Sequence, residues 1–147
     1  MNIEKELLIE KAAVGYTICY AESCPLRDHC LRWLVGQHLP DTATTYRCVN
    51  PHAESVATTN CPMYRNDQKV RYAKGMTHLF TDDMPKRVES AVRHDIIALT
   101  NRTYFFEYRN GKRLIPPALQ EDIRDLFRYH GWTRDITFDA YVEDYEW

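Results

Sequence analysis

The stretch CYAESCPLRDHC, residues 19–30, carries three of the five cysteines of this 147-residue chain, and Cys48 and Cys61 follow it. Cys24 and Cys61 each stand directly before a proline. Proline is favoured at the first position of a helix because its missing N–H would be unpaired there in any case. The two Cys-Pro steps therefore predict two short helices, each beginning beside a thiol.

Four of the cysteines form a candidate metal site. A helix N-terminus lowers the pKa of a nearby thiol, and the thiolate is the form that binds metals. We predict a structural zinc ion held by Cys19, Cys24, Cys30 and Cys61, with Cys48 as an additional candidate ligand. The intervals of four, five and thirty residues differ from the Cys-x2-Cys pairs of zinc ribbons and bacterial ferredoxins. Two alternatives therefore stay open: a 4Fe–4S cluster, and no metal, with reduced thiols packed in the core.

Composition and length indicate an ordinary folded chain. Hydrophobic residues make up 44% and charged residues 27%, which is typical of a soluble globular protein, and we expect a single domain over residues 1–147. The N-terminal stretch does not resemble a secretory signal, and no apolar run reaches the length of a membrane span. Five cysteines are an odd number for a closed disulfide framework, so we expect reduced thiols and a cytoplasmic location.

Periodicity predicts an α+β fold. We expect a cysteine-rich lobe over residues 15–75, which contains the two short helices and a long loop over residues 40–60. Residues 76–147 are expected to form a helix, a β-hairpin, a second helix and a terminal strand. Ahead of the lobe, residues 2–13 favour a helix. After Cys61-Pro62 a helix is expected to run to about Ala73.

The elements of the second part rest on three sequence signals. Val88, Val92, Ile96 and Leu99 recur at helical spacing. Asn110-Gly111 follows the aromatic run TYFFEYR and precedes a short apolar run, which is a typical hairpin signal. Pro116-Pro117 then opens a helix that ends near Gly131, and residues 136–147 alternate partly, as a strand does.

Charge is unevenly distributed, although the net charge is only −2. Residues 61–114 hold eleven basic and six acidic side chains, whereas residues 115–147 hold three and eight. The simpler interpretation is a solvated surface with internal charge complementarity. The alternative is a surface that binds an anion or nucleic acid, for which the candidate residues are Arg65, Lys69, Arg71, Lys74, Arg109, Lys112 and Arg113. Aromatic side chains next to this candidate surface could stack on bases: Tyr104, Phe105, Phe106 and Tyr108. The favoured interpretation is that they pack in the core.

Signatures of catalysis are missing from the sequence. The five glycines are isolated, so there is no Gly-rich phosphate loop, and neither a Ser nucleophile elbow nor an H-E-x-x-H motif is present. His78, His94 and His130 are available as bases, but no pattern links one of them to a cysteine. We therefore predict no catalytic residue and a non-enzymatic module. An unidentified protein is the first expected partner, nucleic acid the second, and a membrane is not expected.

Several short motifs along the chain resemble a known family. They are the Cys24–Arg32 stretch, Val49-Asn50-Pro51, Cys61-Pro62, Val70–Met76, Tyr108–Ile115, Gln120, Leu126-Phe127, Gly131, Phe138-Asp139-x-Tyr141 and Trp147. Together they are similar to a family of short bacteroidete proteins of unknown function, over nearly the whole chain from about Cys19. The resemblance implies a small intracellular protein with cysteines at the positions of Cys19, Cys24, Cys30 and Cys61. It implies no activity, substrate or catalytic residue.

Overall fold

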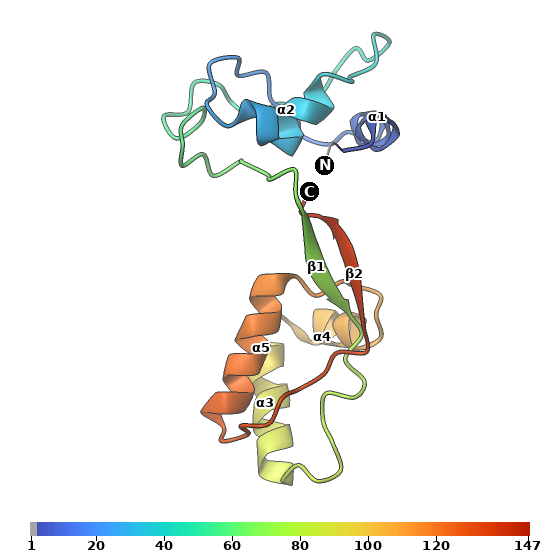
Figure 1. Ribbon diagram of the computed structural model, residues 1–147, viewed down its shortest axis with the longest axis vertical. Helices are drawn as coiled ribbons and strands as arrows, with labels where there is room; N and C mark the ends of the chain where they lie inside the picture. The colour runs from blue at the N-terminus through green and yellow to red at the C-terminus, as the bar shows by residue number, and fades with distance from the viewer. Residues whose placement is uncertain (1–2) are drawn as a thin grey trace. The chain divides into compact units, whose positions relative to one another are not determined.

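In the computed structural model, which describes residues 3–147, the chain forms two compact units (Figure 1). The first unit contains the residues up to Lys69 together with Tyr145–Trp147, and the second is Val70–Asp144. Helices and a two-stranded antiparallel sheet together confirm the α+β class. The predicted division of a single domain at residue 75 stays a prediction.

The first unit is built on α1 (Lys5–Ala13), the 3-10 helix η1 (Arg27–His29) and α2 (Leu31–Gly36). The buried side chains of Leu8, Ala12, Ile18 and Val35 form its core. The helix predicted over residues 2–13 is thus found over residues 5–13, and residue 2 lies outside the described part of the chain.

Neither Cys-Pro step begins an α-helix, which corrects the prediction. After Pro25 the chain makes only η1, because Cys30 is extended and Leu31 N donates a 2.7 Å hydrogen bond to the Arg65 carbonyl. That bond pairs the chain with the segment after Cys61 and interrupts the helix.

The segment after Cys61-Pro62 contains a turn and then β1 (Lys69–Lys74), where a helix was predicted. Val70 and Tyr72 are half-buried, while Lys69, Arg71 and Lys74 are exposed. This alternation has the period of a strand, and the pairing partners of β1 stabilise it.

The second unit surrounds β1 with partners from distant parts of the sequence. On one side β1 pairs with β2 (Ala140–Tyr145), which lies within the predicted terminal strand. On the other, Ala73 and Ile115 exchange two backbone hydrogen bonds of 3.0 and 2.8 Å. The buried Gln120 side chain donates 2.9 Å hydrogen bonds to the carbonyls of Arg71 and Ile115, and so fixes this junction.

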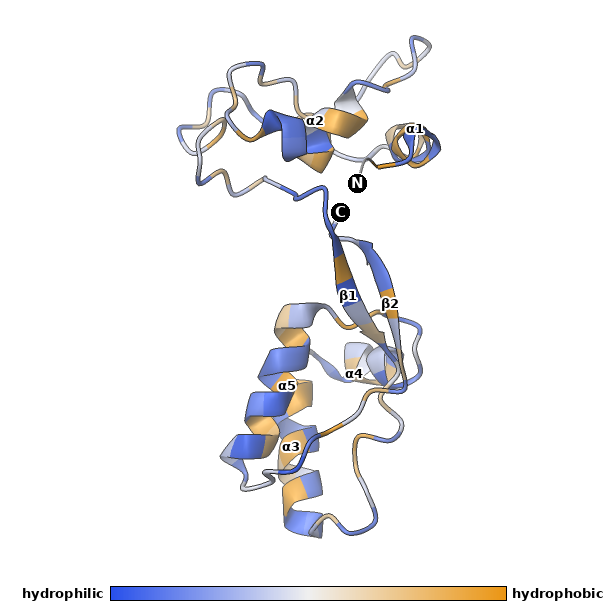
Figure 2. Ribbon diagram, in the orientation of Figure 1, coloured by the Kyte–Doolittle hydropathy of each residue, from blue (hydrophilic) through white to orange (hydrophobic). Residues whose placement is uncertain are grey.

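Two long helices, α3 (Lys86–Leu99) and α5 (Pro117–Tyr129), supply most of the core of the second unit. Val88, Val92 and Ile96 of α3 are buried, as are Ile123 and Phe127 of α5. Figure 2 shows the hydrophobic residues of α5 on the side that faces α3 and its hydrophilic residues on the outer side. The apolar spacing in the sequence therefore identified both helices, although Leu99 is exposed.

The predicted β-hairpin is wrong: the aromatic run forms helix α4 (Arg102–Arg109). Asn101 caps it, since its side-chain oxygen accepts a 2.8 Å hydrogen bond from Tyr104 N. Phe105 and Tyr108, three residues apart on one helical face, are buried. Gly111 has φ +75°, the left-handed conformation that ends helices, so Asn110-Gly111 stops a helix here and does not join two strands.

Candidate functional site

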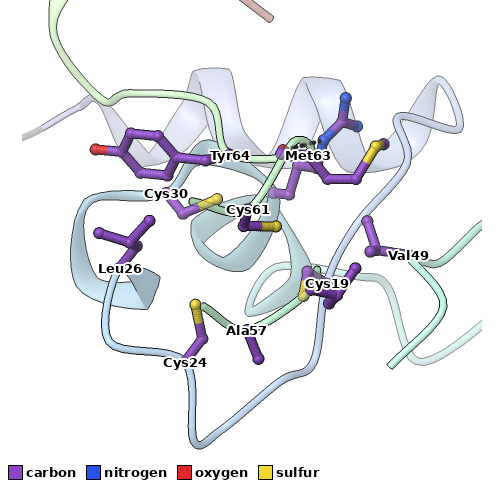
Figure 3. Close-up of a pocket in the computed structure, with 11 residues that line it drawn as sticks. Cys19, Cys24, Leu26, Cys30, Val49, Ala57, Cys61, Met63 and Tyr64 are labelled. Atoms are coloured by element: carbon purple, nitrogen blue, oxygen red, sulfur yellow. Dashed lines mark hydrogen bonds between the residues drawn. The ribbon is translucent and has the colours of Figure 1, made fainter. Parts of the chain in front are cut away.

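Four cysteines line one small cavity in the first unit (Figure 3). They are Cys19, Cys24, Cys30 and Cys61, the four that the sequence singled out. Apolar side chains, among them Leu26, Val49, Val56 and Met63, complete the wall. The cavity holds about 20 Å³, roughly the room for a single water molecule.

Burial in this cavity favours the protonated form of the Cys19 thiol. Burial raises the pKa of Cys19, and the hydrogen bond from the backbone of Ala21 only partly offsets this effect. Cys24 and Cys61 do not lie at α-helix N-termini, so the helix dipole that was expected beside each of them is not present. The cavity is thus built from thiols packed among apolar groups.

Arg32 is the buried cation on the wall of this cavity, with 7% of its surface exposed. Its Nε donates a 2.8 Å hydrogen bond to the Met63 carbonyl, and Nη1 donates one of 2.9 Å to the Thr17 carbonyl. The guanidinium also lies 5.0 Å from the ring centroid of Tyr16. Arg32 therefore links three segments that are far apart in the sequence, and its first role is structural.

The prediction of a metal-binding protein is wrong. Within residues 3–147, no group of three or more His, Cys, Asp or Glu side chains is arranged to hold a metal ion. All five cysteines are free. The same finding overturns the iron–sulfur alternative, which would need the same four sulfurs. Cys48, the additional candidate, is exposed, and its thiol donates to its neighbour's carbonyl, that of Val49.

Backbone pairing holds the long loop that a metal was expected to fix. Ile18 N donates to the Arg47 carbonyl over 3.0 Å, and Val49 N donates to the Ile18 carbonyl over 2.9 Å. Val49 and Val56 are buried. The loop thus has its own hydrogen bonds and its own apolar anchors.

The predicted basic residues are divided between the two units. Arg65 and Lys69 belong to the first unit, where Arg65 donates to the Tyr64 carbonyl and Lys69 lies over the Tyr145 ring. Arg71 is stacked 3.7 Å from the Tyr141 centroid. Arg113 is paired with Glu107 at 2.7 Å and stacked on Tyr104. These four side chains already have partners within the protein.

The remaining three, Lys74, Arg109 and Lys112, lie around the turn at Gly111. Lys74 Cγ is 3.4 Å from the position that a Cβ at Gly111 would occupy, so its side chain crosses this turn. Arg109 and Lys112 flank the same glycine in sequence, and both are exposed. None of the ion pairs formed by residues 3–147 uses any of the three.

Helix α4 extends this cluster with an aromatic ring and another cation. Arg102, Phe106 and Arg109 are four and three residues apart, which places them on one face of the helix. Phe106 is 42% exposed, and the Arg102 guanidinium lies 5.9 Å from its centroid. Arg102 has no carboxylate partner among the described ion pairs either. We call Lys74, Arg102, Phe106, Arg109 and Lys112 the basic–aromatic surface.

Sequence reasoning missed Arg102 as a member of this surface, and it placed Phe106 on a strand. The helical spacing of Arg102, Phe106 and Arg109 was a usable signal, but it was outweighed by the Asn-Gly hairpin signal. The three histidines considered as bases contact carboxylates: His78 lies 3.1 Å from Asp139, and His94 and His130 lie 3.4 Å and 2.6 Å from Asp95.

Comparison with known proteins gives a family but no function. The model of a family of unknown function, DUF6078, matches residues 1–147. This match confirms the resemblance to an uncharacterised family over the whole chain, while the bacteroidete origin stays a prediction. Neither the curated proteins nor the solved structures contain a match. None of the helices in the described residues is long and apolar enough to cross a membrane.

Proposed function

We propose that this chain, which belongs to the DUF6078 family of unknown function, is a binding module for single-stranded nucleic acid. The observation that carries the proposal is the basic–aromatic surface: Arg102 lies 5.9 Å from the ring of the exposed Phe106, and three further cations lie around the turn that follows α4. The proposal also places the protein in the cytoplasm, in keeping with its five free cysteines.

The four cations favour a ligand that carries several phosphates. Like charges that lie within a Debye length, about 10 Å, repel one another, and a bound anion relieves that repulsion. Lys74, Arg109 and Lys112 meet at one turn, and Arg102 lies two helical turns from Arg109. Such a row of cations matches a phosphate backbone better than it matches a single small anion.

Phe106 favours a single strand over a duplex. An exposed ring beside guanidinium groups offers a stacking surface for a base, and bases are free to stack only where they are unpaired. The outer face of α4 presents such a ring between two arginines. A duplex would use the cations and leave the ring without a partner.

The salt dependence of binding tests the phosphate contacts. A fluorescently labelled oligo-dT or oligo-U is titrated with the protein at several salt concentrations, and anisotropy gives the affinity. For single strands, each phosphate contact contributes about −0.7 to the slope of log K against log salt. Four contacts predict a slope near −3 by that estimate, and Arg109→Gln or Lys112→Gln reduces its magnitude by about 0.7. The matched control is Lys86→Gln, which removes an exposed cation that is paired with Glu89.

A pair of aromatic variants tests the stacking contact. Phe106→Ala is expected to weaken binding by about 1–3 kcal/mol, the usual contribution of one stacked base. Tyr104→Ala is the control, since Tyr104 is similarly exposed but its ring is covered by Arg113 at 3.7 Å. Equal losses in the two variants, or no binding of either oligonucleotide at low salt, would overturn the proposal.

A further inference from the structure

A second, larger cavity lies at the end of α5 in the second unit. It holds about 340 Å³, which is within the range of small-molecule sites. The segment of residues 132–137, which follows α5 and leads toward β2 (Figure 1), forms one wall, and Arg124, Phe127 and Arg128 of α5 form the other. The site shares no residue with the basic–aromatic surface.

Three guanidinium groups, those of Arg124, Arg128 and Arg134, line this cavity, against one carboxylate, that of Asp135. Each of the three arginines has an ion-pair partner that is itself more than half exposed: Glu121, Asp125 and Asp83. Exposed ion pairs contribute little to the free energy of folding, so a bound anion can replace these carboxylates with little loss of stability. The planar fork of arginine matches a phosphate group in two hydrogen bonds.

An aromatic ring accompanies these cations. Trp132 lines the cavity, and the Arg134 guanidinium lies 5.1 Å from its ring centroid. The hydroxyls of Thr133 and Thr137 add hydrogen-bonding groups to the same wall. A second, smaller cavity of about 130 Å³ is also lined by Trp132, Arg134 and Thr137. An elongated ligand bound in the larger cavity therefore has room to extend past residues 132–137.

From these features we infer that the cavity binds a nucleoside monophosphate, with the phosphate among the arginines and the base against Trp132. Phosphate alone would leave the ring and the volume unused. An uncharged nucleoside would make no charged hydrogen bond with the three arginines, which would keep their exposed carboxylate partners. A ligand that combines an anion with a planar ring satisfies both halves of the site.

Calorimetric titration of the full chain with adenosine 5′-monophosphate tests this inference, with adenosine and inorganic phosphate as comparison ligands. The monophosphate is expected to bind about tenfold or more tightly than either one, since it makes charged hydrogen bonds that adenosine lacks and a stacking contact that phosphate lacks. Equal affinity for inorganic phosphate would reduce the site to an anion site and overturn the inference. The absence of heat with all three ligands would overturn it as well.

Variants separate this site from the basic–aromatic surface. Arg128→Gln and Arg134→Gln change exposed side chains and are each expected to weaken monophosphate binding about tenfold. The matched control is Arg87→Gln, which removes an exposed cation of α3 that does not line the cavity. Phe106→Ala is expected to leave monophosphate binding unchanged. Loss in Phe106→Ala, or an equal loss in Arg87→Gln, would contradict a distinct site.

Discussion

The backbone N–H of Asp139 donates a 3.0 Å hydrogen bond to the carbonyl of Gly75, and its carboxylate occupies the space beside that glycine. A Cβ at Gly75 would lie 2.6 Å from Asp139 Oδ2. Gly75 also has φ +83°, which side chains rarely adopt. The end of β1 and the chain entering β2 therefore meet at a position that only glycine fits.

Gly75→Ala is expected to destabilise the protein by about 1–3 kcal/mol, because it combines backbone strain with displacement of the Asp139 carboxylate. Gly131→Ala is the matched control, since Gly131 has φ +87° but nothing within 4 Å of its Cβ position. Gly131→Ala is therefore expected to lower the free energy of unfolding by about 1 kcal/mol, from backbone strain alone. Urea unfolding of both variants measures the difference, and an equal loss of stability would contradict the close contact at Gly75.

Protonation of Asp139 is expected to weaken the fold in acid. Burial raises the pKa of this carboxyl group, but hydrogen bonds from Thr77 and His78 outweigh burial and hold the pKa below its usual value. Because the pKa is lower in the folded state, the stabilisation is complete above the unfolded value of about 3.9 and is lost as pH falls through the folded value.

Asp139→Asn tests this pH dependence. The variant is expected to be less stable than the parent at pH 7, and the difference is expected to shrink as pH falls below about 4. Urea unfolding at several pH values checks it. Asp122→Asn, which changes an exposed carboxylate of α5, serves as the control and should show no comparable trend. A stability difference for Asp139→Asn that is independent of pH would contradict the assignment.

Removal of the α4 cap tests the helix that replaced the predicted hairpin. Asn101→Ala deletes the oxygen that accepts from Tyr104 N and is expected to cost about 1 kcal/mol, whereas Asn101→Asp keeps an acceptor and most of the stability. Thermal unfolding of both variants measures this. In a hairpin Asn101 would lie outside the turn, so similar stability of the parent and the alanine variant would favour that arrangement.

Thiol modification of the native protein is expected to follow exposure. Cys48 is exposed and should react first with a thiol reagent, while Cys30 is buried and Cys19 has a pKa that burial raises, so both should react slowly. Mass spectrometry of partially labelled protein identifies the order. Rapid labelling of Cys30 without unfolding would contradict the packing of the cavity.

Sequence patterns predicted the elements whose stability is local. The apolar spacing of Val88, Val92 and Ile96 identified α3, and Pro117 with Ile123 and Phe127 identified α5. Sequence patterns gave wrong predictions where contacts with a distant segment determine the local structure. Leu31 is held by Arg65, and Ala73 is held by Ile115, so neither residue's conformation can be read from its neighbours in sequence.

The cysteines illustrate the same limit in the site. One cavity is lined by all four predicted ligands: Cys19, Cys24, Cys30 and Cys61. The chemistry assigned to them depended on two helix N-termini that tertiary pairing prevents. Arg102 and Phe106 became part of a candidate surface only once the aromatic run was seen to be a helix.

The core of the first unit includes the last residue of the chain. Trp147 packs against that core, with its ring centroid 5.6 Å from that of Tyr16 and the Lys11 ammonium 4.5 Å above it. Its partners Tyr16 and Lys11 lie before Val70 in the sequence, so this core joins two segments separated by the whole of the second unit. Closing so long a loop costs conformational entropy, and the contacts of Trp147 are therefore expected to be among the last of the first unit to form.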